Sequence, residues 1–310
     1  MNGISIIIPI FNEASNLSDL LEAIMAQTLK PDEVIFVDSG STDKTDQIIA
    51  EFSNGPIFIR HIKNLGGMPG GNRNKGILAS KYDWIAFIDA GIIPSNNWLE
   101  ELMKCAKKNN TKSIFGQCQF TGTTAFSHAV CAVSYGCTSH PVIPASIFHK
   151  DIFKEAGLFP ENLRAGEDTV WLKSFDETFY IRISTNIVVA TYDSFPDSLS
   201  YLSRKYWIYE KSLFKSGLGK PKIIGLTLFF IIALIALITN AQLFFTILTT
   251  YLIVRGVLDP VRKSKKITWW KKFPRSIILA PISAATIDIT IVISRNYENL
   301  KLIRNLLIRR

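Results

Sequence analysis

Two polar turns near the start of the chain carry residues that could bind a nucleotide. Phe11-Asn12-Glu13 follows the apolar run Ile4–Pro9, and Asp38-Ser39-Gly40-Ser41 follows Glu33–Val37. Both runs are short and rich in β-branched residues, which is typical of strands buried on both faces of a parallel sheet. In such sheets ligands bind just beyond the carboxyl ends of the strands. The two turns therefore predict a nucleotide-binding face.

The segment between the two runs predicts a helix, which completes a βαβ unit. Leu17, Leu20, Leu21 and Ile24 recur at helical spacing, with Asn12 or Ser15 placed to cap the start. Three more helices and three more strands are expected downstream. The helices cover Asp46–Phe52, Asn72–Ser80 and Asn97–Lys107, and the strands cover Ile57–Ile62, Trp84–Ile88 and Ile114–Phe120. The four glycines between Gly66 and Gly71 predict a loop.

The first two turns together resemble the opening of the family 2 glycosyltransferases, which typically read I-I-P-x-(Y/F)-N-E and V-D-(D/S)-G-S-x-D. The resemblance covers roughly residues 1–215 and implies the GT-A fold, a Rossmann-like mixed α/β sheet. It implies that Pro9, Phe11 and Glu13 lie against the nucleoside and that Asp38 lies near the base and ribose. Ser39 stands where many members carry a second acid that helps to recognise uracil, so the identity of the donor's nucleobase is left open.

The bland alternative for the second turn is local. Asp38 and Ser41 are residue types that form Asx-turns and helix caps without any ligand. Beside the first turn, we favour the binding role.

Arg73-Asn74-Lys75-Gly76 resembles the helix start at which the family carries an arginine facing the donor diphosphate. A guanidinium at a helix N-terminus suits two phosphates through bidentate hydrogen bonds and the helix dipole. The alternative is a solvated surface arginine. The preceding glycines match neither G-x-x-x-x-G-K-(S/T) nor a dinucleotide fingerprint, which excludes an ATPase or a dehydrogenase.

Asp89-Ala90-Gly91 occupies the place of the family's D-x-D motif, whose acids hold Mg²⁺ or Mn²⁺ against the diphosphate. Such an ion offsets the negative charge that accumulates on the leaving nucleoside diphosphate. Because Gly91 replaces the second acid, the resemblance implies a divalent cation that Asp89 binds weakly. The alternative is that Asp89 only ends a strand and begins a turn.

Glu167-Asp168 opens an apolar helical segment and matches the family's E-D motif, in which the aspartate of inverting members takes the acceptor proton. A carboxylate at a helix N-terminus is held ionised, which suits a general base. The alternative is an ordinary capping acid. The resemblance also implies that Glu167 lies on the donor side and that Arg204, within Ser200–Trp207, helps to close the donor site.

Charge is unevenly distributed along the chain of 310 residues. Residues 1–258 contain 23 basic and 23 acidic side chains, whereas residues 259–310 contain 12 Lys or Arg against 3 Asp or Glu, a net charge of +9. A catalytic region without net charge gives no argument for nucleic acid as a partner. A basic tail beside an apolar segment indicates an anionic membrane surface.

The apolar segment 223–258 predicts a membrane hairpin broken at Thr239–Gln242, with two halves of about 24 Å each against a hydrocarbon core of about 30 Å. A hairpin places Lys220, Lys222 and Arg255 on one side, as the positive-inside rule prefers. A re-entrant or interfacial pair is the rival. Segment 259–310, with Trp269 and Trp270, reads as a basic interfacial anchor, against the alternative of a solvated tail.

We expect a catalytic domain over residues 1–215, with a nucleotide-binding half of about 1–92 and an acceptor half of about 93–215, followed by a helical membrane region over 216–310. The expected reaction moves one sugar from a nucleotide-sugar to a lipid-linked or cell-envelope glycan acceptor, with inversion. No signal peptide is visible and the four cysteines read as reduced, which places the domain on the cytoplasmic side of the inner or plasma membrane.

Two other functions stay open from the sequence. One is a polyprenyl-phosphate glycosyltransferase, whose phosphate acceptor needs no base. The other is a non-catalytic family member that binds glycans or scaffolds an assembly machine, which Gly91 supports.

Overall fold

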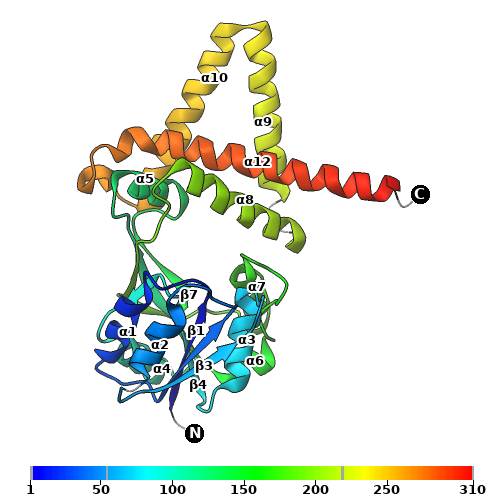
Figure 1. Ribbon diagram of the computed structural model, residues 1–310. Coiled ribbons are helices and arrows are strands. Elements are labelled where there is room, and N and C mark those ends of the chain that lie inside the picture. Colours follow the sequence, from blue (N-terminus) through cyan, green and yellow to red (C-terminus); the bar gives the residue numbers. More distant parts are fainter. Residues whose placement is uncertain (1–2, 54, 218–219, 309–310) are drawn as a thin grey trace. The chain divides into compact units, whose positions relative to one another are not determined.

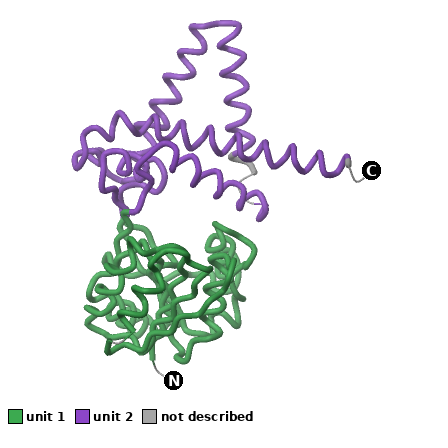
Figure 2. The backbone as a smooth tube through the Cα atoms, in the orientation of Figure 1, with its two compact units in different colours: residues 1–119, 139–193 green, residues 120–138, 194–310 purple. Residues whose placement is uncertain are grey.

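The computed structural model describes residues 3–53, 55–217 and 220–308, and the chain forms two compact units (Figure 2). The first contains residues 1–119 and 139–193, and the second contains residues 120–138 and 194–310. The units therefore do not follow the expected division at residue 215, because residues 120–138 and 194–215 group with the C-terminal helices.

The first unit is built on one mixed sheet of eight strands in the order β3-β2-β1-β4-β7-β6-β8-β5. Four strands are mutually parallel, and β7 runs antiparallel to β4 and to β6, as β5 does to β8. This confirms the predicted mixed α/β sheet. The strands are β1 (Ile4–Ile10), β2 (Glu33–Asp38), β3 (Phe58–Lys63), β4 (Trp84–Phe87), β5 (Ile92–Pro94), β6 (Ser113–Phe120), β7 (Ser139–His149) and β8 (Ser184–Tyr192).

The helices of the first unit are α1 (Leu17–Met25), α2 (Thr45–Phe52), α3 (Pro69–Ala79), α4 (Trp98–Asn109), α6 (Lys150–Glu155) and α7 (Glu167–Phe179). The four apolar residues that predicted α1 are all buried. The predicted cap is wrong: Asn16 occupies the N-cap position, without a side-chain hydrogen bond to the helix. Asn12 instead has a left-handed backbone (φ 57°), and its side chain turns toward residue 42.

The glycine run is only partly a loop, because α3 begins at Pro69 and takes Gly70 and Gly71 into its first turn. Proline is favoured at that position since its missing N–H is unpaired there in any case. A Cβ atom on Gly70 would lie 2.1 Å from the carbonyl oxygen of Pro160, and one on Gly76 would lie 2.4 Å from Cγ2 of Ile7. Glycine thus lets α3 pack closely on β1 and on the segment before α7.

An aromatic cluster fixes α7 against the sheet. Trp171 of α7 is buried, stacks on Phe159 with ring centroids 4.8 Å apart, and donates a hydrogen bond of 2.8 Å to the carbonyl oxygen of Gly157. Phe148 and Phe175 pack edge-on or tilted against the same indole. Aromatic pairs in such arrangements add to the burial of their area. The cluster therefore sets the position of the N-terminus of α7, where Glu167 and Asp168 lie.

The second unit is helical. In Figure 1, α9 and α10 form a hairpin and α12 runs across its base. The break falls at Asn240, inside the predicted Thr239–Gln242, where the side-chain oxygen of Asn240 accepts a hydrogen bond of 3.0 Å from the amide of Leu243. The helices are α5 (Ala125–Ser134), α8 (Leu199–Ser216), α9 (Lys220–Thr239), α10 (Ala241–Ile253), the π-helical η1 (Val254–Leu258), α11 (Asp259–Ser264), the 3₁₀ turn η2 (Trp269–Lys272) and α12 (Ser276–Ile308).

Among the described residues, two helical stretches are long and apolar enough to cross a membrane, 241–264 and 276–307. Only 11% of the first apolar window is buried, against 44% of the second. The second stretch carries a buried acid, Asp288, whose Oδ2 lies 2.6 Å from Nε of Arg255. Intramembrane or interfacial charges are tolerated when they are paired in this way.

Candidate active site

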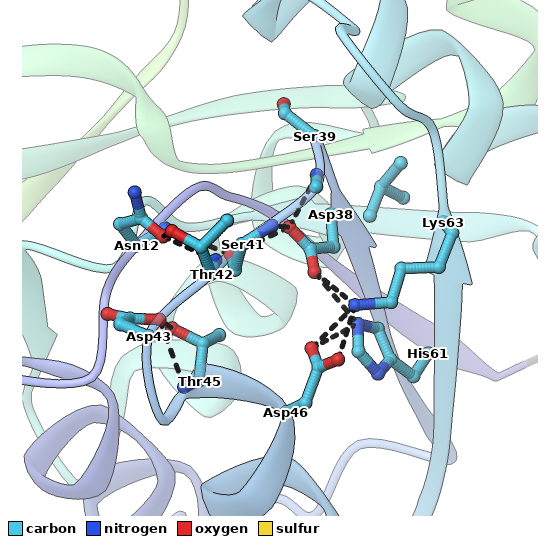
Figure 3. Close-up of polar contacts among 12 residues, drawn as sticks. Asn12, Asp38, Ser39, Ser41, Thr42, Asp43, Thr45, Asp46, His61 and Lys63 are labelled. Carbon is cyan, nitrogen blue, oxygen red and sulfur yellow. Dashed lines mark hydrogen bonds and ion pairs between the residues drawn. The ribbon is translucent and has the colours of Figure 1, made fainter.

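The two turns predicted to bind a nucleotide are hydrogen-bonded to each other (Figure 3). The amide of Asn12 donates to Oγ of Ser41 over 2.9 Å, and the amide of Thr42 donates to Oδ1 of Asn12 over 2.8 Å. The amide of Glu13 donates to Oγ1 of Thr45 over 3.0 Å. Side chains of one turn thus satisfy the backbone of the other, as buried or turn backbone groups require. The turns form a single polar edge at the carboxyl ends of β1 and β2.

Asp38 is fully buried and shapes its own turn. Its Oδ1 accepts hydrogen bonds from the amides of Gly40 (3.0 Å) and Ser41 (2.9 Å), and its Oδ2 lies 2.7 Å from Nζ of Lys63. Burial acts to raise the pKa of Asp38, but the hydrogen bonds from Lys63, Ser41 and Gly40 outweigh it and hold the pKa well below its usual value. Asp38 thus forms the local turn bonds, and its contact with a base or ribose stays a prediction.

The hydroxyl group of Ser39 also forms hydrogen bonds within the protein. Its Oγ donates to the carbonyl oxygen of Gly67 over 2.8 Å and accepts from Nδ2 of Asn72 over 2.8 Å. Asn72 donates with the same amide to the carbonyl oxygen of Val37 over 3.1 Å. A hydroxyl has one proton to donate, so Ser39 can offer a nucleobase only an acceptor in this arrangement.

Asp38 also lies beside two polar side chains that the sequence did not single out, Asp46 and His61. Asp46, His61 and Asp38 bring potential metal-ligand atoms within 4.8 Å of one another. Nζ of Lys63 already lies 2.6 Å from an oxygen of Asp46, and Nε2 of His61 lies 3.4 Å from Oδ2 of Asp38 (Figure 3). The ammonium group thus acts as the counter-ion of both acids. The one local signal is that His61 and Lys63 are two apart on a strand and share a face.

Arg73 joins two of the predicted acids. Its guanidinium is almost fully buried, with Nη2 2.8 Å from Oδ1 of Asp89 and Nη1 bonded to Oε1 of Glu167. Burial acts to lower the pKa of Arg73, but the charges of Asp89, Glu167 and Asp168 outweigh it and raise the pKa. Both terminal nitrogens therefore point at carboxylates, whereas the resemblance implied an arginine that faces phosphates.

Glu167 and Asp168 occupy the first turn of α7, after Gly166 with φ 80°. Glu167 is buried, and burial raises its pKa although Arg73 opposes the shift. Asp168 is half-buried, and its Oδ1 accepts a hydrogen bond of 2.7 Å from the amide of Thr169. Asp168 thus bonds locally at the helix start, and its charge also interacts with that of Arg73.

The nucleoside side of the predicted site is open at Phe11. Pro9 is half-buried within β1, opposite Val37 of β2. Phe11 keeps 42% of its surface exposed, and Cζ of Arg164 lies 5.6 Å from the centre of its ring. The sequence did not single out Arg164, although its place three residues before Glu167 was a usable signal.

Glu13 adds a further acid to this edge. Burial raises the pKa of Glu13, a hydrogen bond from Asn16 opposes the shift, and the charges of Asp89 and Asp43 add to it.

Arg204 differs from the other predicted site residues in that it belongs to the second unit, on α8. Its contact with a donor stays a prediction.

Comparison with known proteins gives one family and a consistent set of relatives. Residues 5–127 match the model of Glycosyl transferase family 2. The glycosyltransferase AglE of Haloferax volcanii is 28% identical over 208 residues, which cover 62% of this chain and 67% of AglE. Matches to uncharacterized glycosyltransferases of Rickettsia bellii and Rickettsia felis cover only 26% and 29% of those longer proteins.

Solved structures match over most of the chain. The mannosyltransferase PcManGT from Pyrobaculum calidifontis, in complex with GDP-Man and Mn²⁺, superposes with a TM-score of 0.54 at 14% identity, covering 97% of this chain and 88% of that one. Residues 1–349 of S. aureus TarS, in complex with UDP-GlcNAc, superpose with a TM-score of 0.52 at 14% identity, covering 92% and 91%. At this identity both similarities concern the fold alone.

Proposed function

Because this chain is a family 2 glycosyltransferase with a GT-A fold, we propose that it moves a single sugar from a nucleotide-sugar to a lipid-linked or cell-envelope glycan acceptor, with inversion. The observation that carries this proposal is the contact of Arg73 with both Asp89 and Glu167. It joins the acid predicted to face the donor diphosphate to the start of the helix that bears the predicted base.

The nucleoside of the donor lies, in this proposal, along the hydrogen-bonded edge of the two turns, against Pro9, Phe11 and Glu13. The exposed ring of Phe11 offers an apolar face, and Asp38 and Ser39 hold the second turn in shape. Solved structures of the same fold contain UDP-GlcNAc and GDP-Man, which supports a nucleoside-diphosphate sugar without choosing the base.

Asp168 acts as the general base. A sugar hydroxyl is a poor nucleophile, so its proton must leave as the oxygen attacks the anomeric carbon. Asp168 is half-buried and lies in the first turn of α7, where the helix dipole and the charge of Arg73 both favour a carboxylate. Glu167 supports it indirectly, because its bond to Arg73 fixes the same turn.

A divalent cation, Mg²⁺ or Mn²⁺, fits Asp89 better than it fits the group around Asp38. The carboxylate of Asp89, two residues after β4, is 42% exposed, whereas Nζ of Lys63 already bonds to both Asp38 and Asp46. Bound at Asp89, the ion would offset the charge of the leaving diphosphate. Because Asp89 would be the one protein acid that binds the ion, and because Mg²⁺ gives up its bound water reluctantly, we expect a modest affinity.

The second unit anchors the enzyme in the inner or plasma membrane with the catalytic domain in the cytoplasm. The hairpin of α9 and α10 exposes large apolar side chains, and no charged residue occurs from Ile223 to Val254. The net charge of +9 over residues 259–310 supports contact with anionic lipids on the cytoplasmic face.

The full-length protein in detergent should be screened against the diphosphates of uridine, guanosine, adenosine, cytidine and thymidine by thermal shift, with and without Mn²⁺. We expect one of them to raise the unfolding temperature, more strongly with the ion, and its sugar conjugates to be hydrolysed or transferred. Absence of stabilisation by every nucleotide would contradict the proposal.

A further inference from the structure

The candidate site carries more negative than positive charge. The charges of Asp89, Glu167 and Asp168 act on one buried cation, Arg73. Glu13 adds a further acid, because its charge interacts with that of Asp89. A nucleoside diphosphate adds further negative charge. One weakly held divalent ion balances only part of this charge, so the site needs another cation that can reach the phosphates.

Arg73 is poorly placed to be that cation. Its side chain is only 4% exposed, and its two terminal nitrogens are engaged by Asp89 and Glu167. Turning it toward a phosphate would leave the buried carboxylate of Glu167 without its partner, which is strongly unfavourable.

Arg164 is better placed. It is exposed, it lies in the segment just before α7, and no ion pair joins it to another residue in the described ranges of the chain. Its guanidinium rests on the ring of Phe11. Phe11 follows β1 and Asp89 follows β4, and these strands are parallel neighbours with Ile7 opposite Phe87. Arg164 therefore lies at the sheet edge where Asp89 also emerges.

We propose that Arg164, rather than Arg73, is the side chain that binds the diphosphate of the donor, an inference that rests on the function proposed above. The planar guanidinium can stack on Phe11 and present its edge to phosphate oxygens at the same time. A contact with an aromatic ring at an exposed position is weak, so the guanidinium can shift on the ring while it forms two charge-assisted hydrogen bonds with the phosphates. Arg73 then acts as a positioning residue for Asp89 and Glu167.

The test compares Arg164→Gln with wild type by calorimetric titration of the full-length protein in detergent. The ligands are the nucleoside diphosphate that stabilises the wild type best, the matching monophosphate, and the nucleoside. The control is Lys173→Gln, which removes one charge from an exposed residue of α7 whose partner is Glu177. Arg164→Lys keeps the charge and removes the planar fork.

A hydrogen bond to a charged group contributes about 1.5–3 kcal/mol. We therefore expect Arg164→Gln to lower the affinity for the nucleoside diphosphate by about 10- to 100-fold. We expect a smaller loss for the monophosphate, none for the nucleoside, and an intermediate effect for Arg164→Lys. Equal weakening of all three ligands would place Arg164 on the nucleoside and overturn the inference, as would unchanged diphosphate binding. A wild type that binds no nucleotide would contradict the proposed function itself.

Discussion

Nη2 of Arg73 lies 2.8 Å from Oδ1 of Asp89, and the same guanidinium bonds through Nη1 to Glu167, 94 residues further along the chain. The contact joins the end of β4 to the start of α7 through one buried cation. Asp89, which we predict to face the donor, is thereby linked to the helix that bears Asp168.

This arrangement predicts a large loss of stability on removal of Arg73. Arg73→Gln should lower the free energy of unfolding by about 3–5 kcal/mol, because it leaves a buried carboxylate unpaired. The loss should be smaller at low pH, since burial already raises the pKa of Glu167 and a protonated Glu167 needs no partner. Denaturant unfolding of the full-length protein measures both effects.

Arg182→Gln is the matched control for that experiment. Arg182 also pairs with a carboxylate, that of Asp176, but both side chains are largely exposed. Exposed pairs contribute about 0–1 kcal/mol. Equal losses in the two variants would show that burial of the Arg73 pair has no energetic consequence.

Acid should act on the second turn through Asp38. Because the pKa of Asp38 in the folded protein lies well below its usual value, its stabilising contribution is present above a pH of about 4 and is lost as the pH falls toward the folded pKa. Asp38→Asn should therefore be destabilised relative to wild type at neutral pH, and the gap should narrow below pH 4. Unfolding midpoints measured across this range give the curve.

Asp46→Asn is the control for Asp38→Asn. Asp46 is the other acid bonded to Lys63, but its side chain is exposed. We expect a much smaller and less pH-dependent effect. A gap between Asp38→Asn and wild type that stays constant down to pH 2 would contradict the assignment.

Local patterns predicted much of the first unit, because the spacing of apolar residues reflects which face of a helix or strand is buried. The apolar spacing of Leu17, Leu20, Leu21 and Ile24 predicted both α1 and its buried face, and the β-branched runs predicted β1 and β2. The cap was missed because Asn12 bonds to Thr42 of the neighbouring turn, a contact 30 residues away.

Contacts between distant segments account for the other differences. Gly70 lies inside α3, where a Cβ atom would meet the carbonyl oxygen of Pro160, a contact that the glycine run itself does not reveal. The partners of Arg73 and the stacking of Arg164 on Phe11 depend on how the sheet brings its strand ends together. Residues 120–138 belong with the C-terminal helices because, for example, His128 bonds to the carbonyl oxygen of Trp269.

The two possible metal positions can be separated by mutation. Asp89→Asn should abolish the dependence of nucleotide binding on Mn²⁺. His61→Ala should leave that dependence unchanged, because Lys63 already bonds to both acids of the group around Asp38. Gly91→Asp should raise the affinity for the ion by restoring a second oxygen ligand. Full activity after exhaustive chelation, or loss of the Mn²⁺ effect in His61→Ala alone, would contradict the placement at Asp89.

The hairpin should hold the protein in the membrane independently of charge. Wild type should stay in membranes at high salt, which screens the basic tail, and Ile231→Asp with Ile235→Asp should become salt-extractable, since each acid costs about 2.5–3.5 kcal/mol at the centre of a membrane helix. Both residues are exposed on α9. Fractionation of washed membranes gives the result.

Ile181→Asp, at an exposed isoleucine of the first unit, is the control and should behave as wild type. Wild-type protein that washes off with salt alone would show that the apolar helices lie at the interface and that charge holds the enzyme there.

The most direct measurement of the central claim is the rate of sugar transfer by Asp168→Asn beside its affinity for the donor nucleotide. If Asp168 is the general base of an inverting transfer to a hydroxyl, the rate should fall by about 10²- to 10⁴-fold while nucleotide affinity stays within a few-fold of wild type. Transfer at the wild-type rate would contradict the role of Asp168 and favour an acceptor, such as a phosphate, that needs no base.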